Sequence, residues 1–149
     1  MERHTKNLEE LQGLAGQWVR ELRPHADRAT VVGLSGELGA GKTSFVQGVA
    51  KALGVKEHVT SPTFVLIKKY PIPKSPFLIN NFSFLIHADA YRLNSGADLG
   101  PLRWKELLAE PRTLLILEWP ERVRDALPDD IINLIFEVSG EGRLVSMNN

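Results

Sequence analysis

The feature that most constrains this chain is the stretch from Gly36 to Thr43, which reads Gly-Glu-Leu-Gly-Ala-Gly-Lys-Thr. It fits the pattern G-x-x-x-x-G-K-[ST], in which backbone N–H groups surround phosphates, the lysine neutralises the β and γ oxygens and the hydroxyl binds Mg²⁺. Glycines at 36, 39 and 41 let the backbone turn tightly and approach a phosphate without a Cβ clash. The stretch therefore predicts a phosphate-binding loop.

The residues on either side of this loop provide the context that it needs. Residues 29–34 are apolar and β-branched, which predicts a short strand. After the loop, apolar residues recur at helical spacing up to Leu53, and Gly54 follows as a C-terminal cap. The N-terminus of such a helix adds unpaired N–H groups and its dipole to the anion site. A glycine-rich turn without a ligand is the alternative, and the agreement of strand, loop and helix argues against it.

The composition limits the classes of function. The chain has 149 residues, which predicts a single domain spanning 1–149 with a proper core. Lysine plus arginine number 18, as do aspartate plus glutamate, so any nucleic-acid role is expected to be indirect. Cysteine is absent, which excludes disulfides, thiolate zinc sites and a cysteine nucleophile. With no secretory signal segment and no apolar run of about 20 residues, we expect a cytoplasmic protein without a membrane segment.

An N-terminal helix is predicted from residue 8 to 23, ended by Pro24. Asn7 and Glu10 resemble a capping box with Asn in the first place, and the apolar residues that follow form one stripe. Trp18 lies within that stripe, so we interpret it as a core residue rather than a cofactor stacker.

Hydroxyl residues gather around Pro62, at Thr60, Ser61 and Thr63. One interpretation is a loop with a strand behind it over residues 65–70. The other is a switch that senses the γ-phosphate and Mg²⁺. Both remain open from the sequence. The proline-rich residues that follow, 71–81, are predicted to be the loop of a hairpin.

Two apolar runs each deliver a carboxylate. Residues 82–86 predict a strand that is followed by His87 and Asp89, and residues 113–117 predict a central strand that is followed by Glu118. Open α/β sheets bind ligands at the carboxyl ends of their strands, and phosphate-loop enzymes keep a Mg²⁺ or water-orienting carboxylate there. Both carboxylates are therefore candidate site residues. The histidine is either a ligand or, more simply, a hydrogen-bonded structural residue.

The rest of the chain predicts smaller elements. Residues 94–101 form a turn, and short helices follow at 102–108 and 123–127. Alternating apolar residues over 132–138 predict an outer strand, which turns back into a strand at 143–146.

Four ordered motifs resemble the TsaE (YjeE) family of small bacterial ATPases, which are required for threonylcarbamoyladenosine modification of tRNA. The motifs lie between about Thr5 and Arg143; they are the phosphate loop, Thr60 to Phe64, His87-x-Asp89-x-Tyr91-Arg92-Leu93 and Glu118-Trp119-Pro120. The resemblance implies a three-layer α/β/α phosphate-loop domain with a mixed, largely parallel sheet and a β-hairpin extension. It also implies slow hydrolysis of ATP to ADP with Mg²⁺. The protein would be a monomer when alone and would act with the TsaB–TsaD pair, meeting tRNA only through that complex.

The resemblance also assigns roles to single residues. Lys42 would be the phosphate clamp, Thr43 and Glu118 the Mg²⁺ ligands, and Asp89 the carboxylate that helps to place metal or attacking water. Lys42, Asp89 and Glu118 form the candidate catalytic set, and Trp119 would lie beside the nucleotide. The candidate nucleotide-binding residues are Thr5, Glu37, Leu38, Gly39, Ala40, Gly41, Lys42, Thr43, Ser44, Thr60, Ser61, Thr63, Trp119 and Arg143.

The sequence departs from the family pattern in a longer loop at 71–82, at Leu11, where a threonine is common, and at Trp104, in a region that often has a glycine. A small-molecule kinase is the main alternative function. Five arginines could supply a charge-stabilising lid, although no lid helix can be placed between the strands: Arg92, Arg103, Arg112, Arg122 and Arg124. A nucleotide-gated binding module with incidental hydrolysis is a third possibility.

Overall fold

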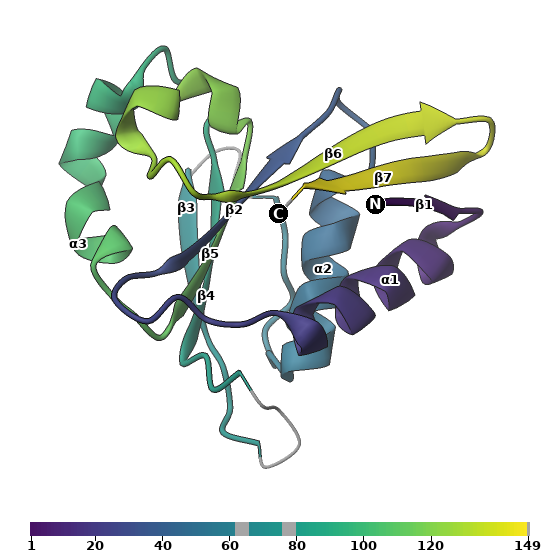
Figure 1. Ribbon diagram of the computed structural model, residues 1–149, viewed down its shortest axis with the longest axis horizontal. Helices are drawn as coiled ribbons and strands as arrows, with labels where there is room; N and C mark the ends of the chain where they lie inside the picture. The colour runs from purple at the N-terminus through teal and green to yellow at the C-terminus, as the bar shows by residue number, and fades with distance from the viewer. Residues whose placement is uncertain (62–65, 76–79, 149) are drawn as a thin grey trace.

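The computed structural model describes residues 1–61, 66–75 and 80–148, which fold around a seven-stranded sheet (Figure 1). Three α-helices and three short 3₁₀ helices accompany the sheet in the described residues. The strands are β1 (Glu2–Thr5), β2 (Thr30–Ser35), β3 (Ile67–Pro71), β4 (Phe84–Asp89), β5 (Thr113–Glu118), β6 (Ile132–Ser139) and β7 (Gly142–Asn148). The helices are α1 (Leu8–Glu21), α2 (Lys42–Leu53) and α3 (Trp104–Leu108), with 3₁₀ helices η1 (Gly96–Leu102), η2 (Pro120–Arg122) and η3 (Arg124–Ala126).

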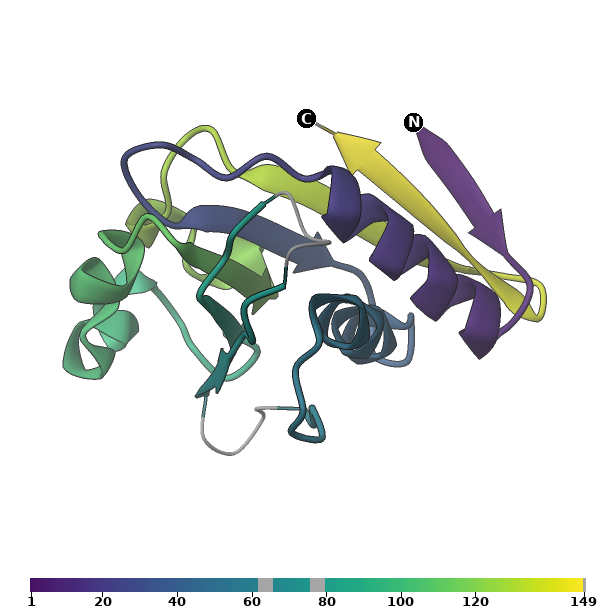
Figure 2. The ribbon, with the colours of Figure 1, turned by 90° about the horizontal axis from the view of Figure 1, so that it is seen from below.

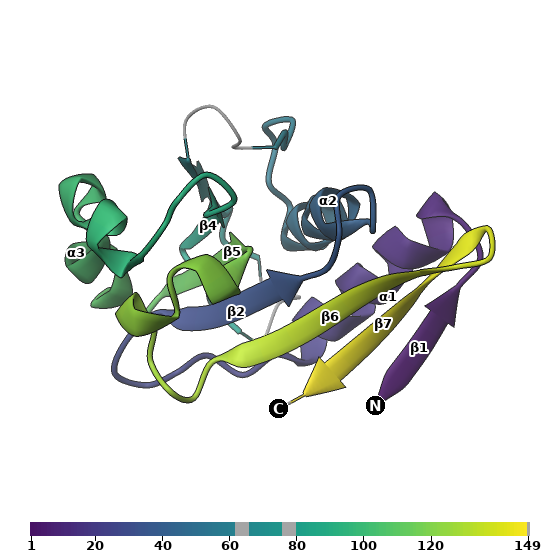
Figure 3. The same cartoon turned by 90° about the horizontal axis from the view of Figure 1, so that it is seen from above.

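The sheet is mixed, in the order β1-β7-β6-β2-β5-β4-β3. Its four central strands, β6, β2, β5 and β4, are parallel, and the antiparallel pairings lie toward both edges. The β6–β7 hairpin extends beyond the central strands, and β1 runs along its outer side (Figure 3). This arrangement confirms the predicted α/β fold with a mixed sheet and a hairpin extension.

The helices divide between the two faces of the sheet, which gives three layers (Figure 2). α1 and α2 cover one face and α3 covers the other, because side chains alternate along each buried strand and supply apolar groups to both faces. The residues of β5 alternate in this way, with Leu114 and Ile116 under α1 and α2, and Leu115 and Leu117 under α3. All are fully buried, which confirms that residues 113–117 form an internal strand.

The caps of α1 and α2 follow from their terminal residues. The side chain of Asn7 accepts a hydrogen bond from the Glu10 amide at 2.9 Å, as predicted. The Glu10 carboxylate, however, accepts from the Lys6 amide at 3.0 Å, one residue before the position that a capping box requires. α1 ends at Glu21, two residues earlier than predicted. Gly54 ends α2 with φ of 80° and donates its N–H to the last turn, as expected of a glycine C-cap.

The sequence reading was wrong about the side of the sheet that the two chain ends form. It missed β1, and it placed residues 132–138 in an outer strand, whereas β6 lies between β2 and β7. The reason is that β7 pairs on both of its sides, with β6 and with β1, which moves β6 inward. β4 also extends to Asp89, so this residue and His87 lie within the strand rather than after it.

The remaining differences concern short elements. The predicted turn at 94–101 is largely the 3₁₀ helix η1, and the short helix predicted at 102–108 is confined to α3. In place of one helix at 123–127, η2 and η3 each make a single turn. The hydroxyl segment is described only up to Ser61, so the predictions for Pro62 and Thr63 lie outside the described residues. No helix in the described part of the chain is long and apolar enough to cross a membrane.

Candidate functional site

The predicted phosphate-binding loop, residues 36–43 (hereafter the phosphate loop), leaves β2 and enters α2 through three residues with positive φ. Gly36, Gly39 and Gly41 have φ of 148°, 80° and 101°, a region that side chains other than glycine rarely adopt. A Cβ on Gly36 would also lie 2.5 Å from the carbonyl oxygen of Phe136. The first helical hydrogen bond runs from the Phe45 amide to the Gly41 carbonyl at 2.9 Å. The glycines therefore perform the conformational task that their spacing predicts.

The two predicted carboxylates face each other because of the register of β4 and β5. Asp89 pairs with Glu118 across this parallel ladder, and Glu118 pairs with Leu34 on the other side. The side chain of Thr43, at the start of α2, lies over Glu118, with its Oγ1 3.2 Å from Oε2 and 3.5 Å from Oε1. Both carboxylate residues are buried, Glu118 at 4% and Asp89 at 7% exposure. Three oxygen-bearing side chains thus converge at the helix N-terminus.

Lys42 points into the same region, and its charge is balanced by nearby acids. Its ammonium donates to the Gly36 carbonyl and lies 3.8 Å from the centre of the Trp119 ring. Burial lowers the pKa of Lys42 below its ordinary value, and the charges of Glu118, Asp89 and Glu121 act in the opposite direction. A buried ammonium beside open space is suited to binding an anion.

Trp119 is held in an unusual backbone conformation. Its φ of 63° places it in the left-handed region, and its amide donates to the Leu34 carbonyl at 3.0 Å. The Tyr91 ring packs against the indole at a centroid distance of 5.1 Å. Backbone strain of this kind clusters at functional sites. The arrangement places the indole beside Lys42, next to the phosphate loop.

Arg143, on β7, contacts the phosphate loop through its guanidinium. Its guanidinium donates to the carbonyls of Gly39, at 3.0 Å, and of Gly142, at 2.9 Å. Thr5 is buried, and its hydroxyl donates to the Arg143 carbonyl at 3.4 Å. Residues from β1 and β7 therefore brace the phosphate loop, and a direct contact of either with nucleotide stays a prediction.

A cavity of about 330 Å³ opens over these groups. Predicted residues that line it are Leu38, Gly39, Gly41, Lys42, Thr43, Ser44, Ser61, Asp89, Glu118, Trp119 and Arg143. Among the described residues, four predicted ones lie outside the lining: Thr5, Glu37, Ala40 and Thr60. The Thr60 hydroxyl instead accepts a hydrogen bond from Lys68. Thr63 lies outside the described residues.

Five further residues line the cavity that the sequence reading did not assign to the site: Asn7, Leu8, Leu11, Glu141 and Gly142. They come from the N-cap and the first turn of α1, and from the β6–β7 turn and the start of β7, so only the tertiary fold brings them to the phosphate loop. The sequence contained a signal for one of these five residues. Leu11 was noted as a departure from the family, and a Cβ on Gly41 would lie only 2.8 Å from its Cδ2.

The oxygen atoms of Thr43 and Glu118 are suited to a hard cation such as Mg²⁺ whose other coordination positions are filled by further ligands. Two ligands in neighbouring octahedral positions at the usual Mg²⁺ distance are about 2.9 Å apart, close to the separation of the Thr43 hydroxyl and the Glu118 carboxylate. Within the described residues, no cluster of three or more His, Cys, Asp or Glu side chains could hold a metal by itself. Mg²⁺ sites of this sparse kind are completed by water and phosphate.

Known proteins resemble this chain over most of its length. The family model described as "Threonylcarbamoyl adenosine biosynthesis protein TsaE" matches residues 5–145. The tRNA threonylcarbamoyladenosine biosynthesis protein TsaE of Borreliella burgdorferi is 35% identical over 116 residues, which cover 77% of this chain and 78% of that protein. Its Bacillus subtilis counterpart is 30% identical over 138 residues, covering 92% and 77% of the two chains.

A solved structure agrees with the sequence comparisons. The crystal structure of YdiB from Bacillus subtilis superposes with a TM-score of 0.75 at 25% sequence identity, and the match covers 99% of this chain and 83% of that one. The family match spans both the phosphate loop and the two strand-end carboxylates. The chain therefore belongs to the TsaE family of tRNA threonylcarbamoyladenosine biosynthesis proteins.

Proposed function

We propose that this protein binds ATP with Mg²⁺, hydrolyses it slowly to ADP, and supports threonylcarbamoyladenosine modification of tRNA as a cytoplasmic partner of a TsaB–TsaD complex. The observation that carries the proposal is the convergence of Lys42, Thr43 and Glu118 at a phosphate-type loop beneath one cavity. The family assignment supports the place in tRNA modification.

Each residue of the site has its own role in the proposed transfer of the γ-phosphoryl group to water. The backbone amides of residues 39–43 surround the β-phosphate, and the Lys42 ammonium neutralises the β and γ oxygens. The Thr43 hydroxyl and the Glu118 carboxylate would hold Mg²⁺, which would offset charge on the phosphate oxygens. Asp89 would help to place the metal or the attacking water, and its Oδ1 accepts a hydrogen bond from the Tyr91 amide at 2.9 Å.

In the described part of the chain, no arginine is placed to approach the γ-phosphate from outside the phosphate loop. Of the arginines in the described residues, Arg143 alone lines the cavity, and it already bonds to two backbone carbonyls. A stabilising residue supplied in trans is worth roughly 10³-fold or more in phosphoryl-transfer rate. We therefore expect a monomer with slow turnover whose competent site is completed by partner proteins. Because ATP carries a γ-phosphate and ADP does not, each nucleotide would favour a different contact with the partner proteins.

The test compares Glu118→Gln with wild-type protein, alone and with the TsaB–TsaD pair. The substitution keeps the shape of the side chain but removes a charged oxygen ligand, so Mg²⁺-dependent ATPase should fall strongly while the fold is retained. Glu137→Gln is the matched control, because Glu137 is an exposed acid on β6 outside the cavity lining, so this variant should retain activity. Wild-type turnover by folded Glu118→Gln would contradict the metal assignment.

The same assay separates the rival functions. A partner-stimulated ATPase that increases modification of tRNA in a reconstituted reaction supports the proposal. Phosphate transfer from ATP to a small acceptor would instead indicate a kinase. Negligible turnover with every partner present would indicate a binding module that uses nucleotide only as a switch.

A further inference from the structure

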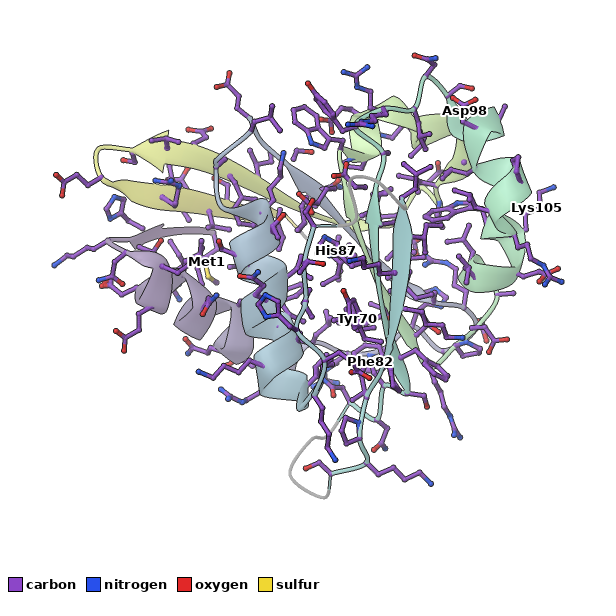
Figure 4. The ribbon with its side chains drawn as sticks, turned by 180° about the vertical axis from the view of Figure 1, so that it is seen from behind. Met1, Tyr70, Phe82, His87, Asp98 and Lys105 are labelled. Carbon is purple, nitrogen blue, oxygen red and sulfur yellow. The ribbon has the colours of Figure 1, made fainter. Side chains whose placement is uncertain are left out.

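His87 is a fully buried, ionisable side chain beneath the site, with 0% of its surface exposed. Figure 4 shows it in the interior, between α2 and the strands β3 to β5. Its Nε2 lies 2.6 Å from Oε2 of Glu118. An ionised carboxylate can only accept a hydrogen bond, so the tautomer of His87 with its proton on Nε2 is the one that can donate to Glu118. Bonds of this length between a donor and a charged acceptor are among the strong ones.

The register of β4 and β5 makes this contact possible. His87 pairs with Ile116, which lies two residues before Glu118 on β5. Side chains two residues apart point to the same face of a sheet, so Ile116 and Glu118 both face α2. The imidazole is therefore the diagonal neighbour of the Glu118 carboxylate, within reach of a long side chain. Asp89 occupies the position directly across from Glu118.

We infer that His87 is a positioning residue, whose Nε2–H fixes the Glu118 carboxylate in the orientation that faces Thr43. The inference rests on the proposed role of Glu118 as a Mg²⁺ ligand. A glutamate has three rotatable bonds, and a second hydrogen bond beneath the carboxylate restricts them before any metal arrives. Glu118 lines the cavity and, in the described part of the site, His87 does not, so it acts through Glu118 rather than on the reacting atoms.

A purely structural histidine would satisfy the buried carboxylate without affecting metal affinity in particular. The two roles are separated by comparing His87→Gln with His87→Asn. The glutamine amide reaches the position of the imidazole Nε2, whereas the shorter asparagine amide reaches only that of Nδ1. Both variants are neutral and polar, so they differ mainly in whether the donor reaches Glu118. Glu118→Gln and the double variant Glu118→Gln/His87→Asn complete the set.

The experiment measures Mn²⁺ and Mg²⁺ affinity of the protein–ADP complex by calorimetry, and ADP affinity separately in the presence of EDTA. His87→Asn should weaken metal binding 10–100-fold, as is typical when the partner of a metal ligand is lost, and leave metal-free ADP affinity unchanged. His87→Gln should restore most of the metal affinity. The double variant should bind metal no more weakly than Glu118→Gln, because both changes act on one carboxylate.

The outcomes distinguish this inference from the proposed function. Unchanged metal affinity in Glu118→Gln would overturn both. Weakened binding in Glu118→Gln with normal binding in His87→Asn would overturn the positioning role alone, as would equal losses in the Asn and Gln variants. If His87→Asn fails to fold, NMR of the wild-type ADP complex still tests the positioning role of His87. The buried Nε2 proton should give a resolved resonance that shifts on addition of Mg²⁺, and a resonance that does not respond would overturn the inference.

Discussion

Gly48 lies on the face of α2 that packs against α1, and its replacement by alanine tests how closely the two helices are held. The added Cβ would lie 2.7 Å from the Cα and the carbonyl oxygen of Gln12, and 2.9 Å from Cβ of Ala15. Unstrained carbon contacts are roughly 3.5–4.0 Å. Because two of the three atoms belong to the backbone, no side chain can rotate to make room. α1 therefore has to move away from α2 by roughly 1 Å.

The magnitude follows from two opposing effects. Overpacking of a tight interface costs about 1–3 kcal/mol, and replacing a helical glycine by alanine returns about 1 kcal/mol. Because the two effects partly cancel, we expect Gly48→Ala to lower the free energy of unfolding by up to about 2 kcal/mol, which corresponds to as much as about 8 °C in Tm for a domain of this size. Gly13 on α1 is the matched control, because a Cβ there meets no atom within 4 Å. Gly13→Ala should gain about 1 kcal/mol in stability.

The assay is urea and thermal unfolding of both variants without nucleotide, followed by circular dichroism. ADP affinity is measured in parallel, because Leu11 of α1 packs on Gly41 of the phosphate loop. A shift of α1 should weaken ADP binding in Gly48→Ala and not in Gly13→Ala. The reasoning would be refuted if Gly48→Ala were as stable as Gly13→Ala, since the helices would then have room for the methyl group.

In a protein whose Trp18 and Trp104 are replaced by Phe, the fluorescence of Trp119 should change when nucleotide binds, because phosphate draws the Lys42 ammonium away from the indole. Unchanged fluorescence at saturating ADP would contradict the placement of the indole beside the nucleotide. Bound phosphate favours the charged lysine, so calorimetric ADP affinity should fall as pH rises through the lowered pKa of Lys42. Lys42→Arg should show no such fall between about pH 7 and 10, and a parallel fall would exclude this lysine as the cause. Asn7→Ala should cost about 1 kcal/mol in urea unfolding by removing the N-cap of α1, and an unshifted midpoint would count against that cap.

The elements that the sequence predicted well depend on local signals. The phosphate loop needs consecutive residues with a fixed spacing, and β5 needs one uninterrupted apolar run. The strand-end carboxylates Asp89 and Glu118 could be found for the same reason, because polar residues that follow an apolar run mark the end of a buried strand. The structure places both at the carboxyl ends of buried strands, whereas their own burial and their register opposite each other were not predicted.

The elements that the sequence did not predict depend on contacts between distant segments. β1 is four residues long and mostly exposed, with no apolar alternation, and it becomes a strand because β7 offers an edge for pairing. The cavity wall formed by Asn7 and Glu141 has the same origin, since a helix N-cap and a hairpin turn carry no local sign that they meet. His87 could be noticed beside Asp89, but its contact with Glu118 requires the parallel register of β4 and β5.

The topology explains why Glu118, rather than a residue on an edge strand, is suited to hold a metal. β5 is inserted between β2 and β4, and the backbone ladder continues past its end on both sides. The Ala90 amide donates to the Glu118 carbonyl at 3.0 Å, and the Trp119 amide donates to the Leu34 carbonyl at 3.0 Å. The backbone at Glu118 is thus fixed from two directions, which holds a ligand in place more firmly than a loop does. Lys42 is different, because under the proposed function its contacts with a carbonyl and an indole would have to be exchanged for contacts with phosphate.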